Sequence, residues 1–264
     1  MASTHLASRQ INAIRYPTMR LFKYRDLSSP GIEALERVFT ILRDQTFWCA
    51  RPNTLNDPEE FVWECDYSPS EETIGLLAEV LTLTTGRSRS DAMERAEAAI
   101  LAGRIEPIAR PVFDRMIEQC RNEIGLACFA TSASNDVMWE RYGGRGEGVC
   151  IEIASPDSML HTQLHPVQYP RRKRLHVDQM LSAFTSRASA KVVYEVALLS
   201  KPPSWAAEAE VRFVSKRQNV AVRISDSTIV HLHLGSKLAP NTVAQLERLI
   251  ETLPYSLATS SRGA

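Results

Sequence analysis

Strand-like segments lie at both ends of this chain, and a block of about 55 residues with helical periodicity separates them. The block, about residues 69–123, has apolar residues at helical spacing and proline or glycine at its breaks, which predicts three helices. Because strands precede and follow these helices instead of alternating with them, the pattern favours an α+β fold over a parallel βαβ sheet. The predicted strands cover residues 19–24, 46–49, 126–130, 149–153, 211–214, 220–224 and 229–234.

We therefore expect a single α+β domain over residues 1–264, with small mixed or antiparallel sheets and an all-helical insertion at about 69–123. Further helical patterns follow the first strand up to Gln45 and cover residues 178–199. Asn241 has the residue type of a helix cap and is predicted to begin a last helix.

The chain lacks the sequence features of a membrane or secreted protein. No apolar run approaches the ~18 residues that a membrane-spanning helix needs, and Met1–Arg15 has no apolar centre of the kind found in secretory signals. The five cysteines show no C-x-x-C spacing, so we expect reduced thiols and no disulfide framework. Together these features predict a cytoplasmic protein.

Opposite charges balance over the whole chain but are distributed unevenly. Residues 57–123 hold fifteen acidic and seven basic residues, whereas residues 171–223 hold eleven basic and four acidic ones. A basic region attracts phosphate groups, so the second segment is a candidate contact for a nucleotide or a nucleic acid. The tetrad 171–174 is also compatible with a solvated basic loop, and the acidic helical insertion with a lid or a protein-partner surface.

Common catalytic and nucleotide-binding motifs are missing from the sequence. Residues 143–148 are rich in glycine, but they lack G-x-G-x-x-G spacing and precede a predicted strand, whereas a dinucleotide-binding loop opens a helix. No P-loop, G-x-S-x-G or H-E-x-x-H motif occurs. The pairs His161/His165 and His231/His233 lack a third ligand at a suitable spacing, so we expect no metal site.

Glu208, Glu210 and Arg212 form the most informative polar cluster. In an extended strand these three side chains would share one face, while Val211 and Phe213 would point into the core. Two carboxylates beside a guanidinium can differ in proton affinity, which suits acid–base work or hydrogen bonding to a ligand. The alternative is an edge strand whose solvent face carries an ordinary ion pair.

Lys23, Tyr24 and Arg25 end the first predicted strand. A guanidinium at such a position suits bidentate phosphate binding, although Arg25 is equally able to pair with a buried carboxylate such as Glu210. The aromatic residues are either core anchors or walls of a binding site. Asn56 and Asp57 are residue types whose side chains commonly hydrogen-bond the backbone of a turn, and we expect them to do so here.

Six segments of the chain together resemble a widespread bacterial family of unknown function. The family has the patterns L-Y-K-Y-R, F-N-D-P-F-E, M-W-x-x-Y-A, G-x-C-I-x-F, Y-E-x-E-W-R and I-x-x-I-x-L-G. In this chain the similar segments are, in the same order, Leu21–Arg25, Leu55–Glu60, Met138–Tyr142, Gly148–Glu152, Ala207–Arg212 and Ile229–Gly235. This chain departs from the patterns at Ala207 and Val211, where aromatic residues are usual, and at Gly143, where alanine is typical.

More distantly, the order of these segments resembles DarT-type and other ADP-ribosyltransferases. The resemblance implies small split sheets with NAD as a substrate in the cleft between them, and a role in bacterial defence or toxin systems. It implies that Glu210 is the ribose-binding catalytic residue and that Glu208 assists on the acceptor side. Arg25 and Lys23 would then hold the pyrophosphate. The aromatic residues that would flank the nicotinamide are Tyr24, Trp139 and Tyr142.

Three functional hypotheses follow. The first is an NAD-consuming ADP-ribosyltransferase or NAD glycohydrolase, with a nucleic acid bound by region 171–223 as one candidate acceptor. The second is a non-catalytic binding or sensor module. The third is a metal-dependent nuclease that uses Asp57, Glu60 and Glu152, although the sequence lacks the acidic-x-lysine pairing that such sites often show.

Overall fold

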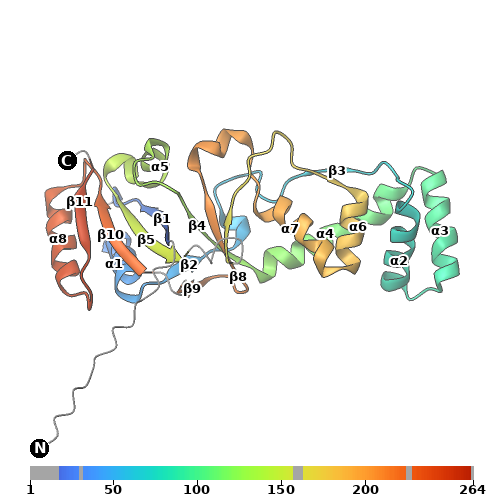
Figure 1. Ribbon diagram of the computed structural model, residues 1–264, viewed down its shortest axis with the longest axis horizontal. Coiled ribbons are helices and arrows are strands. Elements are labelled where there is room, and N and C mark those ends of the chain that lie inside the picture. The colour runs from blue at the N-terminus through green and yellow to red at the C-terminus, as the bar shows by residue number, and fades with distance from the viewer. Residues whose placement is uncertain (1–17, 30–31, 157–162, 224–227, 263–264) are drawn as a thin grey trace, which may run out of the picture.

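The computed structural model describes residues 18–29, 32–156, 163–223 and 228–262. It shows an elongated molecule with β-sheets towards one end and a helical lobe at the other (Figure 1). The mixed α+β class and the several small sheets agree with the prediction. Met1–Arg15, His161 and Ile224, on which parts of the sequence predictions rest, lie outside the described residues. Within the described part, no helix has both the length and the apolar character needed to cross a membrane.

The largest sheet contains four strands and is covered by two helices. The strands are β1 (Thr18–Arg25), β5 (Val149–Pro156), β10 (Thr228–Leu234) and β11 (Ala258–Ser261), and the helices are α1 (Ile32–Asp44) and α8 (Pro240–Glu251). The strand order is β1-β5-β10-β11, with antiparallel pairing except between β10 and β11. Leu21, Ile151 and Ile153 are fully buried and belong to the core that also contains Leu42 of α1 and Leu246 of α8.

Two smaller sheets lie next to this one. They consist of β2 (Phe47–Cys49) with β9 (Val220–Val222), and of β4 (Gly125–Phe129), β8 (Val211–Ser215) and β6 (Leu164–Pro166) in the order β4-β8-β6. Backbone hydrogen bonds between Phe22 and Ala130 join β1 to the end of β4, and those between Ala50 and Leu126 join the end of β2 to β4. The strand β4 is therefore joined to β1 at one of its ends and to β2 at the other.

The helical lobe is built from two separate parts of the chain. Its helices are α2 (Thr73–Thr85), α3 (Arg89–Leu101), α4 (Ile105–Glu123), α6 (Val177–Thr185) and α7 (Arg187–Leu198), with the short parallel pair β3 (Glu64–Asp66) and β7 (Arg174–His176) beside them. Leu77, Phe113, Met180 and Val193 share one hydrophobic core. The three helices predicted at 69–123 exist, but they do not form a lobe alone, because α6 and α7 supply the other side of its core.

One predicted helix cap is wrong. Asn241 lies inside the first turn of α8, whose N-cap is Ala239 and whose first helical residue is Pro240. Proline is favoured at this position because its fixed φ angle suits a helix and its missing N–H would have no partner there. The remaining helix, α5 (Asp136–Tyr142), is capped by Asn135 and packs through Trp139 against β1.

Candidate functional site

A cavity of about 290 Å³ lies where β1, β2 and β4 meet the segment that enters β8. We call it the first cavity. Six of the seven side chains predicted to form the site line it: Lys23, Tyr24, Arg25, Tyr142, Glu208 and Glu210. The seventh, Trp139, is fully buried behind Tyr24, with the two rings edge to face at 5.2 Å. Trp139 therefore supports the site from the core and does not form its wall.

The backbone that carries the two glutamates differs from the predicted strand. A short 3₁₀ helix, Pro203–Glu208, ends at Ala209, which adopts a left-handed conformation with φ of 45°. The strand β8 begins only at Val211, so Glu208 is not one of its residues. Because of the turn at Ala209, Glu208 and Glu210 nevertheless both reach the first cavity. Val211 and Phe213 are buried in the sheet core, as expected.

Glu210 lies in a buried network of ion pairs. Its Oε1 accepts a hydrogen bond of 2.7 Å from Nε of Arg212, and its Oε2 lies 2.7 Å from Nζ of Lys201. Burial alone would raise the pKa of the Glu210 carboxyl group, but the charges of Arg212 and Lys201 outweigh burial and lower it to about 2. The hypothesis of a solvent-facing ion pair on an edge strand is wrong, because these side chains are buried and β8 is a central strand.

Arg212 extends the same network away from the first cavity. Its Nη1 and Nη2 donate to the two carboxylate oxygens of Glu60 at 2.5 and 3.0 Å, and Nη1 also donates to the backbone oxygen of Leu198 at 2.5 Å. Arg212 is fully buried, so each of these bonds replaces a lost contact with water. The guanidinium thus connects β8 with the end of α7 and with the polar turn that follows β2.

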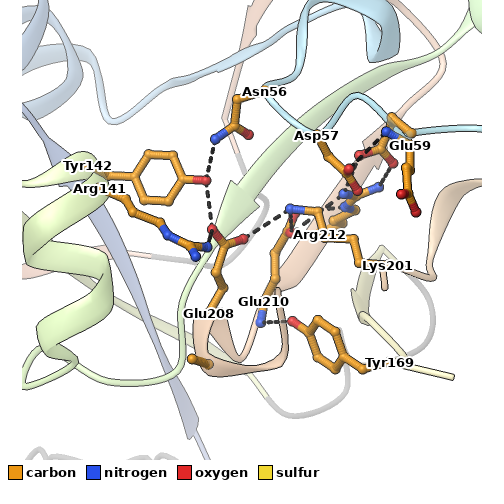
Figure 2. Close-up of polar contacts among 12 residues, drawn as sticks. Asn56, Asp57, Glu59, Arg141, Tyr142, Tyr169, Lys201, Glu208, Glu210 and Arg212 are labelled. Carbon is orange, nitrogen blue, oxygen red and sulfur yellow. Dashed lines mark hydrogen bonds and ion pairs between the residues drawn. The ribbon is translucent and has the colours of Figure 1, made fainter. Parts of the chain in front are cut away.

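Glu208 is held by three donors (Figure 2). Its Oε1 accepts hydrogen bonds from Tyr142 Oη at 2.8 Å and Arg141 Nη1 at 3.1 Å, and its Oε2 accepts one from Lys201 Nζ at 3.0 Å. Burial raises the pKa of the Tyr142 hydroxyl, which keeps this group protonated as a donor. Asn56 Nδ2 donates to the same hydroxyl at 2.6 Å. Asn56 therefore orients Tyr142 instead of forming the predicted side-chain-to-backbone turn bond.

Lys23 and Arg25 have no carboxylate partner within the described residues. Lys23 Nζ donates to the backbone oxygen of Cys128 at 2.7 Å, and burial together with the Arg25 charge lowers its pKa to about 8. Nε of Arg25 is buried and has no hydrogen-bond partner. Burial and the neighbouring Arg37 lower the pKa of Arg25. Two unneutralised cations at the end of β1 make this wall of the first cavity suited to an anion.

A second cavity, of about 840 Å³, lies between α1 and β2 and shares Arg25 and Trp48 with the first. Trp48 is 51% exposed, since its neighbours Phe47 and Cys49 occupy the buried positions of β2. Arg37 and Thr40 of α1 add polar groups to the lining of the second cavity. The two cavities therefore adjoin at one cation and one aromatic ring.

The residues of the nuclease hypothesis are engaged elsewhere. Glu60 is paired with Arg212, and Glu152 is paired with Arg20 at 3.1 Å and with His233 at 2.9 Å. Asp57 accepts a hydrogen bond from the backbone N–H of Glu59, which is the predicted turn bond. Across the described ranges, no group of three or more His, Cys, Asp or Glu side chains is arranged to hold a metal ion.

The basic region 171–223 does not form a single exposed surface. Lys201 and Arg212 are buried in the ion-pair network, and Lys173 donates to the backbone oxygen of Glu59 at 2.6 Å. Arg174 pairs with Asp66 at 3.0 Å. Only part of the positive charge counted in the sequence is therefore available to a nucleic acid.

Lys201 is the site residue that sequence reasoning missed. It is 3% exposed, bridges Glu208 and Glu210, and lies over the ring of Trp205 at 4.8 Å. Lysine is normally a surface residue, so no local pattern distinguishes this one. The nearest signal is its position seven residues before Glu208, in the segment that also contains Glu210 and Arg212.

A comparison with protein families matches residues 138–213 to a family described as "Protein of unknown function (DUF2971)". The matched segment contains most of α5 together with Glu208, Glu210 and Arg212, but not the two cations of β1. The predicted resemblance to a family of unknown function thus agrees with the comparison over this segment. Searches among curated proteins and among solved structures found no match. The more distant resemblance to ADP-ribosyltransferases therefore depends on the residues themselves.

Proposed function

We propose that this protein binds NAD in the first cavity and breaks the bond between nicotinamide and ribose, passing ADP-ribose to an acceptor or to water. The observation that carries the proposal is the presence of two unpaired cations, Lys23 and Arg25, in the same cavity as the ionised Glu210. A dinucleotide requires both features, because its pyrophosphate is anionic and its ribose develops positive charge as nicotinamide leaves.

Glu210 suits electrostatic stabilisation and not proton transfer. With a pKa of about 2 it stays ionised near neutral pH, and its two cationic partners fix its position. A carboxylate has about four acceptor sites, so Glu210 retains capacity to accept a hydrogen bond from a ribose hydroxyl. Glu208 holds the Tyr142 hydroxyl at the first cavity and is the proposed acceptor-side group.

The arrangement of the cavities suits a ligand with two halves. Arg25 lies at the junction of the two cavities, where a pyrophosphate would connect two nucleosides. The half-exposed ring of Trp48 offers a stacking surface for the adenine on the side of the second cavity. The meeting of small sheets at this point also supports an ADP-ribosyltransferase type of fold.

The experiment is incubation of the purified protein with NAD, with chromatographic measurement of released nicotinamide and calorimetric measurement of NAD binding. We expect Arg25→Met to weaken NAD binding at least about tenfold, since a charge-assisted phosphate contact contributes roughly 1.5–3 kcal/mol. The melting temperature should not fall, because the replaced guanidinium has a buried Nε without a partner.

Arg43→Met is the matched control. Arg43 also lies in this half of the molecule, but it is exposed, pairs with Asp44 and lines neither cavity. The Arg43→Met variant should therefore bind NAD with the same affinity as the wild type. The absence of both NAD binding and nicotinamide release from the wild-type protein would overturn the proposal.

The binding or sensor module is the second candidate, and one observation favours it. Both carboxylate oxygens of Glu210 already bond to buried cations, which is also the arrangement of a purely structural ion-pair network. In that case NAD or another nucleotide binds and is recovered unchanged. The acidic helical lobe is then a candidate surface for a protein partner, and the exposed Arg171 and Arg172 are candidate contacts for a nucleic acid.

A further inference from the structure

A chain of polar side chains crosses one face of the four-stranded sheet, outside both cavities. His231 and His233 lie two residues apart on β10 and their rings stack at 4.3 Å between centroids. Ser260 lies opposite His233 on β11, and Glu152 lies opposite His231 on β5. The register of three strands therefore brings a hydroxyl, two imidazoles and a carboxylate together.

When each imidazole carries a single proton, one arrangement of the hydrogen bonds in this chain satisfies every group. Nε2 of His233 lies 2.9 Å from Glu152, whose other oxygen pairs with Arg20, so this nitrogen carries the proton and donates. Nδ1 of His233 is then an acceptor, and the Ser260 hydroxyl lies 3.3 Å from it. Nε2 of His231, 2.8 Å from the same hydroxyl oxygen, completes the chain as a donor.

This order of contacts places a serine, a base and a carboxylate in the relation found at activated serine nucleophiles: the base bonds the hydroxyl with one ring nitrogen and the carboxylate with the other. The serine is exposed, whereas the side chains of His233 and Glu152 are about one-fifth exposed. The nucleophilic atom is thus accessible and its partners are mostly shielded.

We propose that Ser260 is an activated nucleophile that accepts the acyl group of small carboxylic esters, with His233 as its base and Glu152 as the residue that positions His233. This activity is separate from the proposed NAD chemistry, because none of the three residues lines either cavity.

The proposed reaction balances with water as the second reactant. The Ser260 oxygen forms a bond to the ester carbonyl carbon while its proton moves to Nδ1 of His233. The bond to the leaving alkoxide breaks, and the alkoxide takes that proton. Water then attacks the acyl-serine, His233 accepts a proton from the water and returns it to the serine oxygen, and the carboxylic acid leaves.

His231 is a positioning residue in this arrangement. Burial, and next the adjacent His233, lower the pKa of His231, which keeps its ring neutral at neutral pH. A neutral ring with its proton on Nε2 holds the serine oxygen from one side and leaves the hydroxyl proton directed to His233. This fixes the hydroxyl rotor, which is otherwise free to turn.

The test uses the full chain with 4-nitrophenyl acetate for turnover and a fluorophosphonate for covalent labelling, followed by peptide mass spectrometry. We expect release of nitrophenolate and a label on the peptide that contains Ser260. Ser260→Ala should abolish both. Ser261→Ala is the matched control, because Ser261 is the adjacent exposed serine of β11 and points to the other side of the strand; it should behave like the wild type.

Two further variants separate activation from simple exposure. His233→Gln should lower the acylation rate about 10²-fold or more, the usual contribution of a general base. Glu152→Gln should lower kcat with an unchanged KM, a division that a loss of packing does not produce. Labelling of Ser260 and Ser261 at equal rates, labelling of another residue, or an unchanged rate in His233→Gln would each overturn the proposal.

Discussion

Glu210 has its two carboxylate oxygens bound to different cations, so we expect its replacement to affect both folding and the proposed catalysis. In Glu210→Gln, Lys201 loses the nearer of its two charged partners while remaining buried. We expect a loss of about 3–5 kcal/mol in the free energy of unfolding, as for other broken buried pairs. Nicotinamide release, measured in parallel, should fall about 10²–10³-fold.

The pH dependence of stability provides a direct check on this charge. Glu210 has a depressed pKa in the folded protein, about 2 against a reference value of 4.5. Its contribution is therefore present above pH 4.5 and is lost as the pH falls towards 2. Chemical denaturation should show this loss in the wild type and a smaller one in Glu210→Gln. Glu195→Gln, at an exposed pair with Lys191, is the control and should change the free energy of unfolding by less than about 1 kcal/mol.

We expect Lys23 to make the proposed binding of NAD depend on pH. Below its pKa of about 8 the ammonium group is charged and attracts phosphate; above it the group is neutral. We expect the affinity for NAD to fall by up to about tenfold per pH unit above pH 8, since binding must then take up a proton. Calorimetry between pH 7 and 9.5 measures this change. Lys23→Met should bind weakly at every pH, and a flat profile in the wild type would contradict the assignment.

At the level of single residues, the sequence predicted a set of side chains that the structure gathers in one cavity. Lys23 and Arg25 lie at a strand end, as expected. Glu208 and Glu210 reach the first cavity through the turn at Ala209 and not through the strand alternation that was predicted for them. Their burial was not predictable, because it depends on Glu60 and Lys201, which the chain supplies from other segments. Trp139 was expected at the ligand from the resemblance to ADP-ribosyltransferases, and a motif does not show which of its aromatic side chains faces the first cavity.

Among the elements, the turn after α5 determines where β1 can end. Gly148 lies so close to the backbone oxygen of Arg25 that a β-carbon there would collide with it. We expect Gly148→Ala to lower the free energy of unfolding by about 1–3 kcal/mol, the usual cost of overpacking. It should also weaken NAD binding, because the displaced strand end carries Arg25.

The control for this variant is another glycine in an unobstructed position. A β-carbon at Gly75, inside α2, meets no atom within 4 Å. Gly75→Ala should therefore raise the free energy of unfolding by about 0.5–1 kcal/mol through lower chain entropy. Thermal denaturation of both variants measures the difference, and equal effects at the two positions would contradict the steric argument.

Long periodic elements were predictable from the sequence, and so were the three-residue strands β2 and β9, which lie inside the predicted strands 46–49 and 220–224; other very short strands were not. The helices α1 to α4 and the strands β1, β4, β5 and β10 lie close to their predicted ranges. The strands β3, β6 and β7 have three residues each, too few to show alternation. They form because the tertiary fold places a partner strand beside them.

On the scale of the whole molecule, separate hydrophobic cores support the sheets and the helical lobe. Phe113 is 2% exposed in the core of the lobe. We expect Phe113→Ala to lower the free energy of unfolding by about 3–5 kcal/mol. Hydrogen exchange should accelerate mainly in α2, α4 and α6, while β1, β5 and β10 keep their protection. Equal acceleration in both halves would show a single cooperative unit.

The bonds of Arg212 have a consequence for how the chain matures on the ribosome. Glu60 is synthesised 152 residues before Arg212, whose guanidinium neutralises it. Lys23 and Arg25 are synthesised before Glu60. Long-range contacts of this kind form only after the intervening chain has emerged. Nascent chains shorter than about 212 residues therefore lack the central ion pairs, and the proposed dinucleotide site is completed only late in translation.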